Sequence, residues 1–387
     1  MAQIVLAEPS RCVGCAACAQ ICPTHSITMR EDKEGFLQPK IDYKTCIKCH
    51  KCEKTCPVLN QEIVNGEKET QAFAAINKDE RIRYISSSGG IFHALAKWTI
   101  NQDGVVFGAR FDEKWEVLHD YSKTLEGIIS FMGSKYVQSR IGDSYKQAKS
   151  FLEQGRWVLF SGTPCQLGGL RAFLGKEYER LIQVDLICFG VPSPGVWRSY
   201  LKEYAQKKGK ITRVSFRDKK EGWKHFKMVI ANDGDAIGQN EDVFMRGFSK
   251  EVYLRKCCNQ CRYRGYHRNS DLTIADYWGV DRYCEEMFDD KGTSIVFCHS
   301  NKGEQLLKGI SESLILVSQT KDNAIAFNPY MVGQHAKETK RTRFFRMFRL
   351  TSSFKKSAFV IDKDDFGTRI RRKIRKSTKK LFHKLVK

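Results

Sequence analysis

Eight cysteines near the start of the chain stand in two runs with the same spacing. Each run places three cysteines at intervals of three residues, a fourth cysteine four residues later, and then a proline. The first run is Cys12, Cys15, Cys18 and Cys22 before Pro23, and the second is Cys46, Cys49, Cys52 and Cys56 before Pro57. Thiolates ligate zinc and iron–sulfur clusters. The spacing therefore indicates metal chemistry at the front of the molecule.

The spacing C-x2-C-x2-C-x3-C-P is typical of two-cluster bacterial ferredoxins, in which the fourth cysteine of each run ligates the other cluster. Structural zinc is the alternative, but four ligands suffice for each zinc ion and do not require this pattern. Disulfides fit poorly, because the first residues lack the basic and apolar regions of an export signal. We assign cluster one to Cys12, Cys15, Cys18 and Cys56, and cluster two to Cys46, Cys49, Cys52 and Cys22.

Four later cysteines are candidates for a second kind of site. Cys165 follows a predicted strand at 157–160 and stands at the start of a helix, and Cys188 follows a predicted strand at 181–187. Cys258 and Cys261 form a C-x2-C pair. Four thiols are the number that a third cubane requires, but spacing alone leaves a redox nucleophile or buried thiols open. The remaining Cys257, Cys284 and Cys298 are interpreted as core or surface thiols.

Two polar segments are candidates for phosphate and ring binding. Ser88, Gly89 and Gly90 precede an apolar helical stretch at 93–100, where free backbone amides favour an anion; an ordinary helix cap is the alternative. The second segment suits a phosphate and a ring system, and a solvated loop is its alternative. It contains Gly133, Ser134, Lys135, Tyr136, Gln138 and Ser139.

The rest of the chain must position these residues. After a polar linker near residues 60–70, predicted strands alternate with helices, which indicates an α/β domain. No run approaches the roughly 18 apolar residues of a membrane span. The net charge of +22 is concentrated in the tail, where nineteen Lys or Arg side chains follow Tyr330 against four Asp or Glu.

The tail contains two basic and apolar segments. The segment 340–350 mixes Arg with Phe, and from Asp364 to Lys387 the apolar residues form one helical stripe. We expect this tail to contact an anionic membrane surface. Nucleic acid is not favoured, because no recognised binding motif accompanies the charge. A solvated tail or a docking helix for a partner is the alternative.

Seven segments of the second domain form a recognisable set. They are S-S-G-G-I-F (87–92), G-S-K-Y-V-Q-S (133–139), F-S-G-T-P-C-Q (160–166), D-L-I-C-F-G-V-P-S-P (185–194), R-D-K (217–219), C-N-Q-C (258–261) and S-D-L-T-I-A-D-Y-W-G (270–279). With these segments, residues 72–330 resemble the coenzyme F-420 hydrogenase/dehydrogenase beta-subunit family. The resemblance implies FAD and a third [4Fe–4S] cluster ligated by Cys165, Cys188, Cys258 and Cys261. It also implies that the Ser88–Gly90 and Gly133–Ser139 segments, with Thr163, contact the flavin. The family often has His after the cysteine of D-L-I-C, where this chain has Phe189.

These observations predict an α+β ferredoxin-like module over residues 1–65, an α/β mixed-sheet flavin domain over 66–335 and a basic helical tail over 336–387. The expected protein is a cytoplasmic iron–sulfur flavoprotein oxidoreductase, peripheral to the inner membrane face through its tail. Asp276 and Lys219 are weak candidates for proton partners. A redox partner protein or soluble donor would supply electrons, and the sequence leaves the substrate undefined. The alternatives are a non-catalytic electron-transfer subunit and an accessory protein of surface-polysaccharide biosynthesis.

Overall fold

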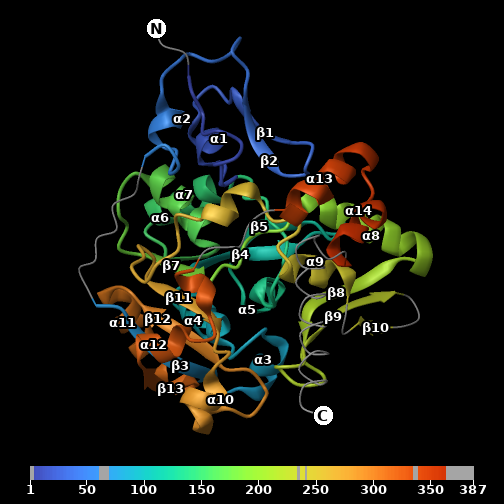
Figure 1. Cartoon of the computed structure of the whole chain (residues 1–387). Coiled ribbons are helices and arrows are strands. Elements are labelled where there is room, and N and C mark those ends of the chain that lie inside the picture. The colour runs from blue at the N-terminus through green and yellow to red at the C-terminus, as the bar shows by residue number, and fades with distance from the viewer. Residues whose placement is uncertain (1–3, 61–68, 233–235, 240–241, 334–338, 363–387) are drawn as a thin grey trace, which may run out of the picture.

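The N-terminal region is built from two short helices and one hairpin. The computed structural model describes residues 4–60, 69–232, 236–239, 242–333 and 339–362. The hairpin pairs β1 (Ile27–Glu31) with β2 (Leu37–Ile41) in antiparallel register. The helices α1 (Ala17–Ile21) and α2 (Lys51–Lys54) each begin directly after a cysteine loop. In Figure 1 this region, in blue, stands on top of the larger body, above α6 and α7.

The larger body contains a sheet of eight strands in the order β13-β3-β12-β11-β7-β6-β4-β5. Strands β4, β6, β7 and β11 are parallel neighbours, and the strands outside them pair antiparallel. The sequence-based prediction of a mixed α/β sheet is therefore confirmed. The strands are β3 (Gln71–Asn77), β4 (Val105–Phe111), β5 (Val117–Ser122), β6 (Val158–Ser161), β7 (Leu181–Leu186), β11 (Leu272–Asp276), β12 (Ser294–Cys298) and β13 (Leu314–Gln319).

Alternating side chains bury both faces of this sheet. In β6, Val158 and Phe160 belong to one core cluster, whereas Leu159 between them belongs to another. This period of two is the pleat of a strand covered on both sides. The helices around the sheet are α3 (Glu80–Ile85), α4 (Ile91–Asn101), α5 (Leu125–Ile128), α6 (Ser144–Glu153), α7 (Pro164–Leu174), α10 (Val280–Tyr283), α11 (Asn301–Gly309) and α12 (Lys321–Ile325).

The two faces of the sheet carry different partners. The cluster of Val158 and Phe160 includes Cys15 and Ala17 from the N-terminal region, together with residues of α6 and α7. The cluster of Leu159 includes residues of α4 and α11. The N-terminal region therefore packs on the same side of the sheet as α6 and α7.

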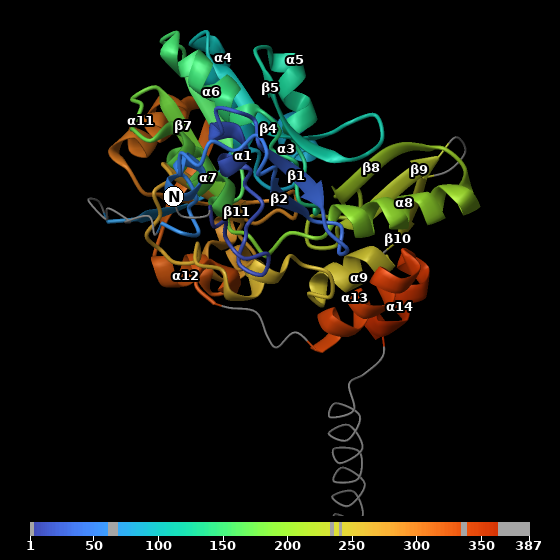
Figure 2. The ribbon, with the colours of Figure 1, turned by 90° about the horizontal axis from the view of Figure 1, so that it is seen from above.

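A second, smaller sheet lies beside the first. It has the order β10-β9-β8, from β8 (Ile211–Asp218), β9 (Lys227–Asn232) and β10 (Ala236–Gln239). Helix α8 (Pro194–Lys208) accompanies it, as Figure 2 shows. Helix α9 (Val243–Ser249) follows, and then η2 (Lys256–Gln260), which contains Cys258 and ends directly before Cys261.

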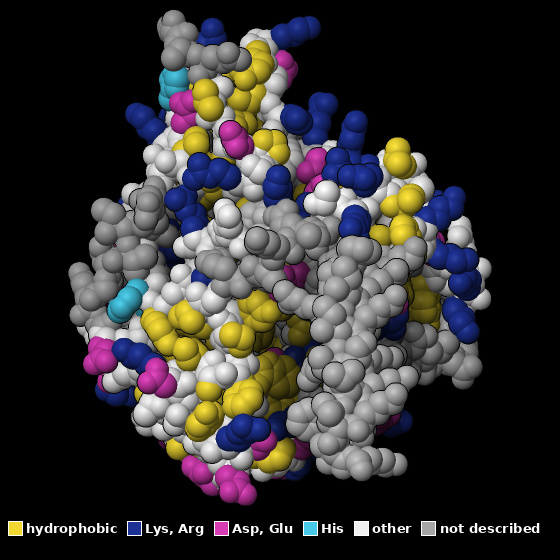
Figure 3. All heavy atoms as spheres, in the orientation of Figure 1, with side chains coloured by type: hydrophobic (Ala, Val, Ile, Leu, Met, Phe, Trp, Pro, Cys, Tyr) yellow, Lys and Arg dark blue, Asp and Glu magenta, His cyan; other side chains and the backbone are white. Residues whose placement is uncertain are grey.

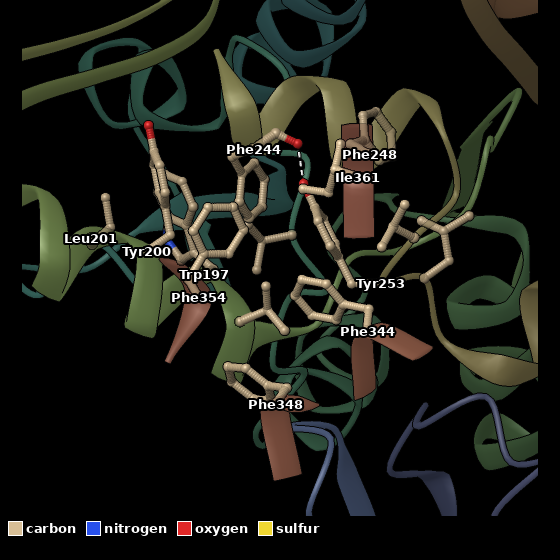
Figure 4. Packing of buried hydrophobic residues seen from close by; sticks show 14 of the residues in the cluster. Trp197, Tyr200, Leu201, Phe244, Phe248, Tyr253, Phe344, Phe348, Phe354 and Ile361 are labelled. Carbon is tan, nitrogen blue, oxygen red and sulfur yellow. Dashed lines mark hydrogen bonds between the residues drawn. The ribbon is translucent and has the colours of Figure 1, made fainter. Parts of the chain in front are cut away.

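Part of the predicted tail belongs to the folded body. Helices α13 (Thr339–Thr351) and α14 (Phe354–Asp362) pack together against α8 and α9. Phe344 and Phe354 are buried in the aromatic cluster around Trp197, Phe244 and Tyr253, as Figure 4 shows. The expectation that the Arg and Phe segment 340–350 faces a membrane is therefore wrong, because its phenylalanines fill the protein core.

The last predicted helix, from Asp364 to Lys387, lies outside the described residues. Within the described part of the chain, no helix has the length and apolar character needed to cross a bilayer. In Figure 3, Lys and Arg side chains are numerous on the upper half of the visible face, and hydrophobic side chains gather on its lower half. The described part of the tail, α13 and α14, contributes apolar packing to the core.

Candidate functional site

The two N-terminal cysteine loops have the same unusual backbone. Gly14 and Ala16, on either side of Cys15, have φ values of 71° and 61°. Lys48 and His50, on either side of Cys49, have φ values of 53° and 58°. Left-handed conformations at Ala, Lys and His are unfavourable and persist where a site needs them. Two loops of different sequence thus wind their cysteines in the same way, as repeated cluster loops require.

The predicted ligands of cluster one lie together. Burial raises the pKa of Cys15, and the charges of Cys18, Cys12 and Cys56 raise it further. Burial also raises the pKa of Cys18 to about 12, with further contributions from Cys12 and Cys56. Thiols that repel one another when ionised are stabilised as thiolates by a bound metal centre.

The predicted ligands of cluster two line a small cavity. Cys22, Cys46, Cys49 and Cys52 border it, with Ile4, Ile27 and Ile41 as apolar neighbours. No three His, Cys, Asp or Glu side chains of the described residues form a site for a single metal ion. A cubane binds each thiolate through a different iron atom, so its ligands need not point at one atom. The residues at both sites fit a cubane in kind and grouping.

The sheet topology brings the four later cysteines together. Cys165 stands in the first turn of α7 after β6, and Cys188 follows the neighbouring parallel strand β7. Burial raises the pKa of Cys165 to about 12, and Cys261 and Cys258 contribute to the rise. Burial also raises the pKa of Cys188, with contributions from Cys258, Cys165 and Cys261. We call Cys165, Cys188, Cys258 and Cys261 the inner thiol set.

A fifth thiol, which the sequence analysis interpreted as a core or surface thiol, lies beside this set. A hydrogen bond with Cys258, followed by burial, raises the pKa of Cys257. The same hydrogen bond lowers the pKa of Cys258 to about 7. The adjacency of the two cysteines was the available signal. Spacing rules could not use it, because only the fold shows that both thiols face the same place.

A cavity of about 590 Å³ opens at the carboxyl ends of β6, β7 and β11. This is where ligands bind in sheets of this kind. Cys188 lines the cavity, so the inner thiol set shares a wall with it. Eight residues predicted to contact a flavin also line it: Ser88, Gly90, Gly133, Ser134, Lys135, Tyr136, Ser139 and Thr163.

The other two predicted contacts lie outside this lining. Gly89 is enclosed by the protein: its amide donates to Ser294 Oγ at 2.9 Å, and an added Cβ would lie 2.3 Å from the Ala75 carbonyl oxygen. The side chain of Gln138 donates through Nε2 to the Val13 carbonyl oxygen at 2.9 Å and accepts at Oε1 from Arg255 at 2.8 Å. Gln138 thus joins the N-terminal region to the body.

A helix start without a side-chain cap and a half-buried lysine line the cavity. The residue before helix α4 is Gly90, which has a φ of 83° and provides no side-chain cap. Its first residues, Ile91 and Phe92, line the cavity. Lys135 donates to the carbonyl oxygens of Ser130 and Met132 at 2.9 and 2.8 Å. Burial lowers the pKa of Lys135 to about 7, so an anion beside it would favour its charged form.

A buried polar chain supports the wall between the cavity and α7. His119 contacts Ser139 Oγ at 2.9 Å, and the Gln166 amide donates to that same Oγ at 2.9 Å. Gln166 in turn accepts from the Thr163 amide at 2.9 Å. Burial lowers the pKa of His119 to about 4, so its ring is neutral near pH 7. These hydrogen bonds fix Ser139 and Thr163 in place.

Both candidate proton partners make strong structural contacts. Asp276 forms a bidentate ion pair with Arg217, at 2.9 and 3.0 Å, and accepts a hydrogen bond from Trp223 Nε1 at 2.8 Å. The Lys219 ammonium donates to the carbonyl oxygens of Arg83 and Lys291, both at 2.7 Å. Asp276 lines the cavity, whereas Lys219 does not. Phe189 lines the cavity and packs on Tyr330.

Comparisons with known proteins agree with this arrangement. Residues 11–60 match the model of the 4Fe-4S dicluster domain, which includes all eight N-terminal cysteines. Residues 155–323 match the model of the C terminus of the coenzyme F420 hydrogenase/dehydrogenase beta subunit, and this match includes the inner thiol set. The first of these models describes a domain with two [4Fe–4S] clusters, and the second is named for a subunit of a hydrogenase/dehydrogenase. The resemblance to the hydrogenase/dehydrogenase beta-subunit family is confirmed.

Two relatives are distant from this chain. The uncharacterized protein MJ1349 of Methanocaldococcus jannaschii is 21% identical over 224 residues, which cover 47% of this chain and 60% of that protein. This chain thus spans well under the full length of that relative. A chain in a xenon-derivatised structure of the F420-reducing [NiFe] hydrogenase complex from Methanosarcina barkeri is 17% identical, with a TM-score of 0.47. That similarity covers 70% of this chain and 90% of the other.

Proposed function

We propose that this protein is an iron–sulfur flavoprotein oxidoreductase with three [4Fe–4S] clusters and one FAD. The observation that carries the proposal is the position of Cys188, which belongs to the inner thiol set and also lines the cavity. A cluster held there would border a flavin held in the cavity. Bound clusters would supply one-electron transfer, and a bound flavin would supply two-electron chemistry with a substrate.

The contact between Cys15 and α7 supports a continuous electron path. An added Cβ at Gly169 would lie 2.9 Å from Cys15 Sγ, so this thiol packs directly on the helix. Cys165 of the inner thiol set precedes Gly169 by four residues, which is about 6 Å along a helix axis. Cys15, a predicted ligand of cluster one, and Cys165 of the inner thiol set thus lie about one turn apart along α7.

The cavity residues support FAD as the ligand. The uncapped start of α4 and the Lys135 ammonium would hold phosphate groups, because both favour negative charge. The aromatic side chains of Tyr136 and Phe189 border the same cavity and would pack against a ring system. Arg217 and Asp276, joined as an ion pair, would form a fixed polar wall at the substrate side.

We divide the chain into a two-cluster region at 1–65 and a flavin and iron–sulfur region that begins at 66. The second region would extend past 335, because α13 and α14 complete its aromatic core. A redox partner protein or a soluble donor would exchange electrons with the N-terminal clusters. The cavity opening favours catalysis by the chain itself over a purely electron-delivering role.

Anaerobic reconstitution with iron, sulfide and FAD tests the proposal. We expect about twelve iron atoms per chain, which is three cubanes, and one FAD. About eight iron atoms with a normal ferredoxin signal would contradict the third cluster alone. Absence of FAD binding would contradict the flavin site. Turnover of artificial donors by the isolated chain would separate an enzyme from an electron-delivery subunit.

A further inference from the structure

The buried arginines of this protein differ in what neutralises them. Five arginines in the described part of the chain are at most 9% exposed. Four of them pair with a carboxylate: Arg83 with Asp289, Arg217 with Asp276, Arg268 with Asp185, and Arg341 with Glu34. Arg255, at 2% exposed the most buried of the five, forms no ion pair with a carboxylate of the described residues. An unpaired buried charge is strongly unfavourable, so another negative group must neutralise it.

The guanidinium of Arg255 lies against the loop that carries Cys12 and Cys15. Its Nε donates to the Cys12 carbonyl oxygen at 2.7 Å, and its Nη2 donates to the Leu37 carbonyl oxygen at 3.0 Å. Its Nη1 donates to Gln138 Oε1 at 2.8 Å, and the Gln138 amide binds the same loop at Val13. Three bonds to neutral oxygen atoms fix the position of the cation without cancelling its charge.

Gly14 shows how closely this contact is built. Its φ of 71° favours glycine, and an added Cβ would lie 2.7 Å from Arg255 Nη1. No side chain at residue 14 could therefore coexist with the guanidinium in its present position. The first cysteine loop is shaped around the cation.

Arg255 also interacts with the inner thiol set, through its backbone hydrogen bonds and through its charge. Its amide donates to the Val191 carbonyl oxygen, three residues after Cys188, and its carbonyl oxygen accepts from the Cys258 amide, both at 2.9 Å. Its charge interacts with the thiols of Cys165 and Cys258 and favours their ionised forms. Arg255 therefore faces both groups of cysteines at once.

We propose that Arg255 is a positioning residue shared by two iron–sulfur sites, and that its charge raises the reduction potential of both. This inference rests on the proposed function. Each added electron increases the negative charge of a thiolate-bound cluster, and a fixed cation in a medium of low dielectric stabilises the reduced state more than the oxidised one. The clusters at Cys12, Cys15, Cys18 and Cys56 and at the inner thiol set would in turn supply the missing countercharge.

Potentiometric titration followed by electron paramagnetic resonance tests this on the reconstituted full chain. The variants are Arg255→Gln, which removes the charge, and Arg255→Lys, which keeps it. Arg341→Gln is the matched control, because Arg341 is also buried and binds the neighbouring Leu254 carbonyl oxygen, yet pairs with Glu34. We expect Arg255→Gln to disfavour reduction of both sites at least tenfold, or about 59 mV for a one-electron couple. Arg255→Lys should shift them by less than half of that, and Arg341→Gln should leave them unchanged.

Every outcome decides the inference. If Arg255→Gln loses one of these clusters while Arg255→Lys keeps both, the charge is needed to hold them, which also supports it. Unchanged potentials in an assembled Arg255→Gln protein overturn it. Loss of clusters from both variants also overturns it, because the shape of the guanidinium would then matter rather than its charge. A parent chain that binds no iron would refute the proposed function itself, a result distinct from these.

Discussion

Cys15 packs on Gly169, and Cys165 stands one helical turn earlier on the same face of α7. An added Cβ at Gly169 would lie 2.7 Å from Cys15 Cβ and 2.9 Å from its Sγ. The N-terminal region is therefore positioned by a helix that also carries a member of the inner thiol set. A glycine is required at this crossing because no other residue allows so close an approach.

We expect Gly169→Ala to loosen the N-terminal region. The added methyl group must displace Cys15, at a cost of about 1–3 kcal/mol. Hydrogen exchange of residues 12–22 should become faster. Gly168→Ala is the control, because its Cβ would instead lie 2.7 Å from the Tyr263 ring. Equal acceleration of exchange at 12–22 in both variants would contradict a specific role for Gly169.

Adjacent cysteines offer a matched pair for the third cluster. We expect Cys258→Ser to lower the iron content of reconstituted protein from about twelve to about eight atoms, because one cubane loses a ligand. Cys257→Ser should keep about twelve atoms. Iron analysis with electron paramagnetic resonance checks both values. The opposite pattern would mean that Cys257 is the ligand and that the C-x2-C spacing is misleading here.

Flavin affinity should depend on pH through Lys135. Burial lowers the pKa of this ammonium to about 7 in the ligand-free protein. Above that pH the side chain loses its charge, and FAD affinity should fall by up to about tenfold per pH unit. Fluorescence titration between pH 6 and pH 9 measures the effect. Lys135→Gln should bind more weakly at pH 6 and with little pH dependence, whereas Lys97→Gln on the outside of α4 should behave like the parent.

Asp276→Asn separates a structural role from proton transfer. It removes the carboxylate from a buried ion pair with Arg217, which costs about 3–5 kcal/mol. Urea unfolding should show this loss. Asp103→Asn, which breaks the exposed pair with Arg156, should change stability by about 1 kcal/mol or less. Normal stability of Asp276→Asn with abolished turnover would instead identify Asp276 as the proton carrier.

The role of the basic tail is tested by where the chain is cut. Removal of residues 363–387 should leave the fold intact and abolish binding to vesicles of anionic lipid, because the apolar faces of α13 and α14 are already buried in the core. Removal of everything after Tyr330 should unfold the protein, since it deletes Phe344 and Phe354 from the aromatic cluster. Co-sedimentation with anionic and neutral vesicles measures binding. Undiminished binding without 363–387 would refute a membrane role for that segment.

Local signals in the sequence predicted much of this architecture. The strands before Cys165 and Cys188, and helix α7 with Pro164 in its first turn, follow from apolar runs that end at turn residues. The number of later thiols was visible in the sequence, but the grouping of Cys165, Cys188, Cys258 and Cys261 depends on which strands are neighbours in the sheet. The parallel pairing of β6 with β7 supplies that information.

Other features had no local signal. The Arg and Phe pattern at 340–350 predicts a helix with one apolar face, but not what covers that face. The structure covers it with Trp197, Phe244 and Tyr253 rather than lipid. Arg255 is likewise one basic residue among many in the sequence. Its contacts with Cys12 and Leu37 lie more than 200 positions away along the chain.

Helix α6 depends on the N-terminal region for its first turn. Oε1 of Gln20 accepts from the amides of Tyr145 and Lys146, at 3.1 and 3.2 Å. An acceptor for these amides thus comes from the segment between Cys18 and Cys22. Expressing the two regions as separate pieces would therefore leave a frayed helix in one of them. During biogenesis, maturation of the N-terminal region would then be coupled to the final folding of the larger body.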